Sequence, residues 1–139
     1  MRGVTVAAVR ASLAGALIVA CTMGPARWQA MNLQPLNVGW QQFFRVQWNS
    51  STFRGQPIVE GYIENVWGFW ARNIQLLVNG YDETGALVGQ LVGWGPFAIG
   101  PGGRVYFNVP VPPAPVYEVA IFSWTWVLDD DWREFNLFR

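Results

Sequence analysis

The residues of this chain that could do chemistry are few, and their types narrow the choice of reactions. The 139 residues include no histidine and a single cysteine, Cys21. Serine-type catalytic triads, cysteine–histidine pairs and zinc sites of the usual Cys/His kinds are therefore excluded. One cysteine cannot form a disulfide within the chain. Nine Lys and Arg balance nine Asp and Glu, so we expect no basic surface for nucleic acid.

Carboxylates are the remaining candidates for acid–base or metal chemistry. Glu60 and Glu64 lie four residues apart on an expected strand, which separates them by roughly 13 Å on one face. This exceeds the carboxylate spacing of both glycosidase classes, so we expect two solvated surface groups. Asp129, Asp130 and Asp131 form either a polar hairpin loop or a Ca²⁺ site, although they lack EF-hand spacing. We predict no enzyme activity, no cofactor and no metal site.

Cys21 lies within an apolar stretch that has the form of an export signal. Arg2 and Arg10 precede the small and apolar residues 11–23, a stretch too short for a bilayer core that needs about 20 residues. Residues 18–21, Ile-Val-Ala-Cys, resemble the bacterial lipobox. The resemblance implies that a diacylglycerol is attached to the cysteine thiol and that a peptidase cuts before this residue. A plain cleaved signal peptide and a short uncleaved anchor are the alternatives.

The sequence therefore divides into three expected parts. Residues 1–20 are a lipoprotein signal peptide, 21–37 are the lipidated N-terminus and a tether, and 38–139 are a β-sandwich domain. Two or three acyl chains on Cys21 would make a stable membrane anchor. We therefore expect the protein in the cell envelope, outside the cytoplasmic membrane. In a Gram-negative source this means the outer membrane or the periplasmic side.

A two-residue hydrophobic period runs through the domain and is typical of β-strands. Strands are expected at residues 42–48, 58–67, 74–81, 86–94, 104–109, 116–128 and 135–138. Turn residues separate them, such as Asp82 and Gly85 of a compact hairpin. Alternation in the longest strand places Trp124 and Trp126 on one face and Ile121 on the other. About seven short strands with such turns predict an all-β sandwich.

Three short motifs between residues 55 and 127 carry a resemblance to a known domain family. They are G-x-I-x-N at 61–65, a segment ending in Y-D-x-x-G at 77–85, and I-x-P-G at 99–102 with Phe107 beyond it. These motifs resemble the FxLYD-type domain of bacterial and archaeal envelope lipoproteins, although Val78 and Gly80 stand where that family has Phe and Leu. The resemblance implies an immunoglobulin-like β-sandwich and supplies no catalytic residue. We also expect the amide of Asn65 to cap backbone groups at its strand end.

Tryptophan is unusually frequent, with nine copies. Core filling is the simplest role for Trp124 and Trp126, because aromatic side chains bury large areas. Four others lie at or near expected turns: Trp67, Trp70, Trp94 and Trp132. We expect these four to be partly exposed and to form a candidate binding surface.

Together these features predict a non-enzymatic envelope lipoprotein whose β-sandwich is an interaction or structural module. Its expected partners are the membrane, through the lipid on Cys21, and an envelope protein or a glycan. The alternative function is a carbohydrate-binding module that uses exposed Trp side chains.

Overall fold

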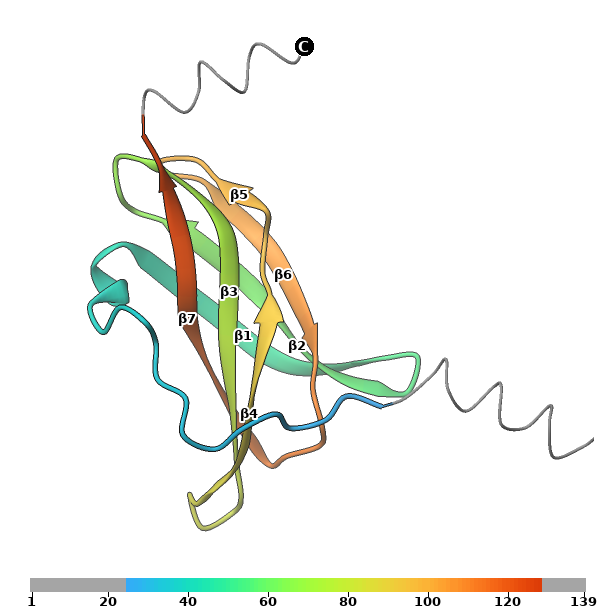
Figure 1. Cartoon of the computed structure of the whole chain (residues 1–139). Helices are drawn as coiled ribbons and strands as arrows, with labels where there is room; N and C mark the ends of the chain where they lie inside the picture. The colour runs from blue at the N-terminus through green and yellow to red at the C-terminus, as the bar shows by residue number, and fades with distance from the viewer. Residues whose placement is uncertain (1–24, 129–139) are drawn as a thin grey trace, which may run out of the picture.

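Two antiparallel β-sheets pack face to face and form the body of the protein (Figure 1). The computed structural model describes residues 25–128 of the chain. The elements are the 3₁₀ helix η1 Trp40–Gln42 and the strands β1 Phe44–Phe53, β2 Gln56–Asn65, β3 Trp70–Tyr81, β4 Leu87–Trp94, β5 Ala98–Ile99, β6 Arg104–Pro110 and β7 Val116–Val127. The predicted all-β sandwich is confirmed.

The strand order places β2 and β3 at the centres of the two sheets. One sheet has the order β1-β2-β6. In the other, β7 pairs with one edge of β3, while β4 and β5 pair with different halves of its other edge. Strand β5 was not expected from the sequence. The strand expected at 135–138 and the expected aspartate loop at 129–131 lie outside the described residues.

The hydrophobic core lies between the sheets and follows the two-residue period. Val59 and Ile63 of β2 are fully buried in one cluster with Leu76 and Val78 of β3. Alternate side chains of a strand point to opposite faces, which is why these pairs lie an even number of residues apart along each strand. Burial of each such side chain contributes about 1.5–3 kcal/mol to folding.

Strand β7 departs from simple alternation at one point. Between Ile121 and Ser123 its register with β3 shifts, which leaves Phe122 as an extra residue. A bulge of this kind moves the residues that follow it to the other face. Ile121 before the shift, and Trp124 and Trp126 after it, therefore pack against the same core. The expectation that Ile121 faces away from the two tryptophans was wrong.

Tyr117 fixes the link that carries the chain from β6 in one sheet to β7 in the other. Its hydroxyl donates a hydrogen bond to the Pro112 carbonyl at 2.6 Å and accepts one from the Ala114 N–H at 2.9 Å. A tyrosine near the start of a strand that bonds back to the preceding corner is a hallmark of immunoglobulin-like sandwiches.

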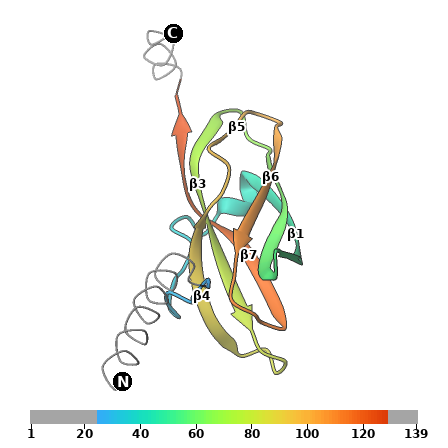
Figure 2. The same cartoon turned by 90° about the vertical axis from the view of Figure 1, so that its right-hand side faces the viewer.

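The segment before η1 is bonded to the sandwich, which differs from the free tether expected up to residue 37. Ala30 forms a bridge with Gln90 of β4, and the Leu36 N–H donates to the Phe122 carbonyl at 2.9 Å. Figure 2 shows this segment, coloured blue to cyan, beside β4. Cys21 and the rest of residues 1–24 lie outside the described residues.

The indole of Trp28 holds the start of this segment against the sheet. It lies over Gly80 of β3 and Gly89 of β4, and a Cβ atom at either glycine would overlap the ring. The ring also lies 6.5 Å from that of Tyr117, between centroids. Glycine at both positions makes the close approach possible, since any other residue would displace the indole.

Asn65 joins two loops at one end of the sandwich. Its side chain is fully buried, and Nδ2 donates to the carbonyls of Phe69 at 2.7 Å and Ile99 at 3.0 Å. Its Oδ1 accepts from the Trp67 N–H at 3.0 Å. The expectation that this amide caps backbone groups at the strand end is confirmed.

We expect Asn65→Ala to lower the free energy of unfolding by about 3 kcal/mol, because buried backbone groups would lose their partners. Urea unfolding followed by circular dichroism measures this. Asn49→Ala is the control, since Asn49 is exposed and makes a single 3.5 Å contact with the Ser50 carbonyl. Equal stability of the two variants would show that the Asn65 bonds contribute little.

Asp82 closes the hairpin between β3 and β4. Its Oδ1 accepts hydrogen bonds from the Thr84 hydroxyl at 2.6 Å and from the N–H groups of Thr84 and Ala86 at 2.9 and 3.0 Å. The Thr84 hydroxyl is the main cause, with the Ala86 N–H second, of a pKa of Asp82 below its ordinary range. The carboxylate therefore stabilises the fold at a pH above its unfolded pKa, and this contribution disappears as pH falls through the folded pKa.

We expect Asp82→Ala to lower the Tm at pH 7, and the difference from wild type to shrink as pH falls from about 4 towards 2. Thermal melts across this range test the effect, with the exposed neighbour variant Glu83→Ala as control. A Tm difference that stays constant with pH would mean that the charged form of Asp82 is not what matters.

Candidate functional site

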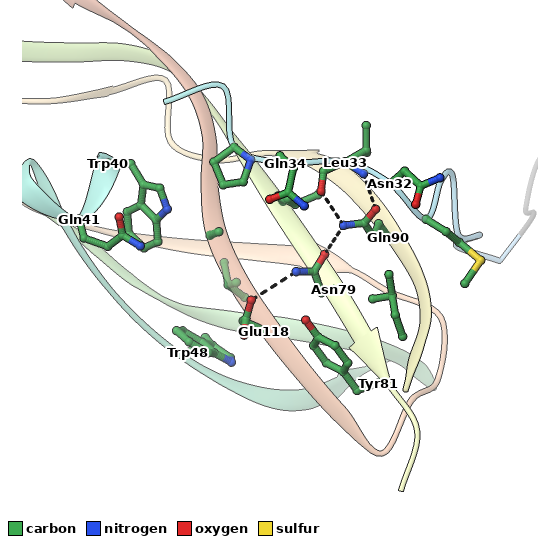
Figure 3. Close-up of a pocket in the computed structure, with 16 residues that line it drawn as sticks. Asn32, Leu33, Gln34, Trp40, Gln41, Trp48, Asn79, Tyr81, Gln90 and Glu118 are labelled. Atoms are coloured by element: carbon green, nitrogen blue, oxygen red, sulfur yellow. Dashed lines mark hydrogen bonds between the residues drawn. The ribbon is translucent and has the colours of Figure 1, made fainter. Parts of the chain in front are cut away.

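A cleft of about 710 Å³ opens on the outer face of the β4-β3-β7 sheet (Figure 3). Leu77, Asn79 and Tyr81 form its floor, because they alternate along β3 with the core residues. Residues 31–35 form one wall, Trp48 lines the opposite side, and Trp40 lies at one end of the cleft. The volume falls within the range of small-ligand sites, about 300–1,000 Å³.

A chain of polar side chains crosses the floor of the cleft from strand to strand. Gln90 and Asn79 are almost fully buried, with 4% and 8% of their surfaces exposed. Gln90 Nε2 donates to Asn79 Oδ1 at 2.8 Å, and Asn79 Nδ2 donates to Glu118 Oε1 at 3.3 Å. Both partners of Asn79 lie directly opposite it in the strand register, which is why the three side chains meet.

Gln90 also holds the wall of the cleft in place. Its Oε1 accepts from the Leu33 N–H at 2.6 Å, and its Nε2 donates to the Leu33 carbonyl at 2.9 Å. The carboxamide thus bonds both polar groups of one backbone residue, as the dashed lines in Figure 3 show. The wall is therefore bonded to the sheet by a buried side chain as well as by the bridge at Ala30.

Two aromatic rings, of Trp48 and Trp40, bound the cleft beyond this wall. Trp48 of β1 has 39% of its surface exposed, and its Nε1 donates to the Tyr117 carbonyl at 3.1 Å. Trp40 of η1 is half-buried and packs against the core. The bond to Tyr117 and the core contacts of Trp40 hold the rings where Figure 3 shows them, at the edge of the cleft.

The cleft is uncharged apart from one carboxylate. Among its lining residues, all within the described part of the chain, Glu118 alone carries a charge. Amides supply most of its polar groups: Asn32, Gln34, Gln41, Asn79 and Gln90. Residues 25–128 hold no cluster of three or more His, Cys, Asp or Glu side chains suited to a metal ion. Such a lining can hydrogen-bond a neutral ligand, and its single carboxylate offers no acid–base pair.

The tryptophans expected near turns are exposed but lie outside this cleft. Trp67, Trp70 and Trp94 have 44%, 40% and 69% of their surfaces exposed. Trp67 packs edge-on against Phe43, with ring centroids 4.8 Å apart, and the Trp70 ring lies against Gly100. Their role as a binding surface stays a prediction. Trp132 lies outside the described residues.

Glu60 and Glu64 lie on the outer face of the other sheet, beside a shallow depression of about 380 Å³ at Glu60. Glu60 Oε2 accepts a hydrogen bond from the Tyr106 hydroxyl at 2.6 Å, which raises the pKa of Tyr106. The Arg104 guanidinium lies 4.3 Å above the Tyr62 ring. These contacts engage Glu60 and the neighbouring side chains of the sheet surface with one another.

Sequence reasoning missed the residues that build the cleft. A signal for one of them was present, since Asn79 interrupts the apolar run Leu76, Leu77, Val78 in a central strand. A polar residue in such a place needs a partner. That partner, Gln90, could be identified only once the register of β3 and β4 was known.

Comparison of the chain with known protein families, with characterised proteins and with solved structures finds no match. Within residues 25–128, no helix combines the length and apolar character needed to cross a bilayer.

We expect Gln90→Ala to release the cleft wall, because Leu33 would lose two hydrogen bonds and Asn79 one. Backbone amides of residues 30–36 should exchange with solvent about 10- to 100-fold faster, which corresponds to about 1–3 kcal/mol. Hydrogen exchange read by mass spectrometry measures this, with the exposed lining variant Gln41→Ala as control. Unchanged protection in Gln90→Ala would show that other contacts hold the wall.

Proposed function

We propose that this protein is a non-enzymatic cell-envelope lipoprotein, anchored through Cys21, whose β-sandwich is a binding module. The observation that carries the anchor is the position of the single cysteine, immediately after Ile-Val-Ala in an apolar stretch that follows two arginines. The remainder of the chain contains no other thiol, which suits an exported protein.

The contact of Trp28 with the sandwich supports a short distance between the proposed lipid anchor at Cys21 and the β-sandwich domain. Trp28 already lies against Gly80 and Gly89 of the sandwich. The seven residues from Cys21 to Trp28 span at most about 25 Å when fully extended. A lipid on Cys21 would thus hold the sandwich close to the membrane surface, with a tether much shorter than residues 21–37.

The chemistry of the cleft supports binding over catalysis. Glu118 is the one acid among the lining residues within the described range 25–128, and the sequence contains no histidine. Paired groups with separated pKa values are the usual requirement for acid–base catalysis. The corner at Tyr117 supports the resemblance to immunoglobulin-like FxLYD domains, and that resemblance supplies no catalytic residue.

Lipidation is tested by expressing the full chain in a Gram-negative host supplied with an alkyne analogue of palmitate. We expect the wild type to be labelled and to sediment with membranes, and Cys21→Ser to be unlabelled. Thr22→Ala, next to the cysteine, is the matched control and should be labelled like the wild type. An unlabelled wild type, or a labelled Cys21→Ser variant, would refute the anchor.

A second candidate function is carbohydrate binding through exposed tryptophans. The exposed fractions of Trp67, Trp70 and Trp94 favour it, since stacking on a sugar needs an accessible ring face. Trp132 belongs to the same predicted surface. The cleft offers a different place for such a ligand, and its lining allows a sharper proposal.

A further inference from the structure

We propose that the cleft on the β4-β3-β7 sheet binds a neutral oligosaccharide, with Trp48 as a stacking platform and Glu118 as a hydrogen-bond acceptor. The proposal rests on the function given above, that the sandwich is a binding module, and it names the ligand class and the site. The site differs from the surface predicted at Trp67, Trp70, Trp94 and Trp132.

The hydrogen-bonding groups of the cleft match those of a sugar. Each hydroxyl of a sugar both donates and accepts, and an amide side chain offers two donors and one acceptor oxygen. Asn32, Gln34 and Gln41 are exposed and line the cleft, so their amides can reach a ligand. Neighbouring hydroxyls on one sugar ring can engage such an amide at two points.

Glu118 is the strongest single acceptor in the cleft. It is exposed, and its Oε1 is positioned by the 3.3 Å bond from Asn79 Nδ2. A carboxylate has about four acceptor positions, so it can accept from ligand hydroxyls while it keeps this bond. The buried amides of Asn79 and Gln90 thus orient the carboxylate before any ligand arrives, which lowers the entropy cost of binding.

The indole of Trp48 supplies an apolar contact of the kind that sugars use. The face of an aromatic ring carries partial negative charge and attracts the C–H groups of an apposed ring. The 3.1 Å bond from its Nε1 to the Tyr117 carbonyl fixes the ring, and 39% of its surface stays exposed. Figure 3 shows Trp48 beside Glu118, so one ligand could contact both.

Charge favours a neutral ligand over an anionic one. Glu118 is the one charged residue among those that line the cleft in the described part of the chain. An anionic glycan would be repelled by this carboxylate, and no lining arginine would compensate it.

The strand pairing argues against an extended peptide as the occupant. Peptides that add to a sheet need a strand edge with unpaired backbone groups. The central strand β3 is paired along both edges, and β4 is bridged to Ala30. On the outer edge of β7, the carbonyls of Tyr117 and Phe122 already accept from Trp48 and Leu36. The cleft therefore offers side chains to a ligand, and few backbone partners.

Calorimetric titration of the lipid-free exported chain with four neutral oligosaccharides and one anionic oligosaccharide tests the proposal. The neutral probes are maltohexaose, cellohexaose, mannohexaose and N-acetylchitohexaose, with hexagalacturonate as the anionic comparison. We expect at least one neutral probe to bind, and both Trp48→Ala and Glu118→Ala to weaken that binding by about tenfold or more. Trp48→Phe should retain most of the affinity, which guards against a folding defect in Trp48→Ala. The exposed aromatic variant Phe53→Ala is the control and should bind like the wild type.

Three results would overturn the proposal: no binding by any neutral probe, tighter binding of hexagalacturonate, or affinity that is lost in Trp94→Ala and kept in Glu118→Ala. The last result would move the site to the turn tryptophans. If the wild type is labelled at Cys21 and the lipid-free chain binds no probe, the glycan site alone is refuted. If the wild type is unlabelled and the lipid-free chain binds a probe, the anchor alone is refuted.

Discussion

The side chain of Gln90 in β4 bonds to a backbone N–H and a backbone carbonyl, as the backbone of a neighbouring strand would. Its carboxamide bonds the N–H and the carbonyl of Leu33, and its own backbone carbonyl accepts from Gln29 and Ala30. A buried amide is costly unless its donors and acceptor are satisfied, and here Asn79 takes the remaining bond. Gln90 therefore links the wall of the cleft to the sheet, and through Asn79 it is connected to Glu118.

The N-terminal segment is held at its two ends by different kinds of contact. At the start, the Trp28 indole lies over two glycines, where van der Waals contact with the bare backbone is close. At the end, the Leu36 N–H bonds to Phe122, the residue that the β7 bulge leaves unpaired with β3. The bulge therefore has a second effect besides returning Trp124 to the core, since it directs a carbonyl outward to receive the incoming chain.

Much of the fold could be predicted from local patterns, and the site could not. Alternation located β2 and β6 closely, and Asn65 and Asp82 bond as their turn positions suggest, because these features depend on residues near in sequence. The bulge at Phe122 arises from pairing with β3, so no local period reveals it. Gln90 and Leu33 are 57 positions apart, and nothing near either residue specifies the other.

The shape of the sandwich accounts for four of the nine tryptophans. A sheet of three strands leaves the ends and sides of the core open, and a large ring covers such gaps efficiently. Trp28, Trp40, Trp124 and Trp126 do this, since all four are half-buried and pack against the core. Trp48 follows the core face of β1 by alternation, yet β1 is an edge strand and the ring reaches past the core to Tyr117. Its exposed face therefore contributes less to packing than those four rings do, and it borders the cleft, which is the physical reason to assign it to a ligand there.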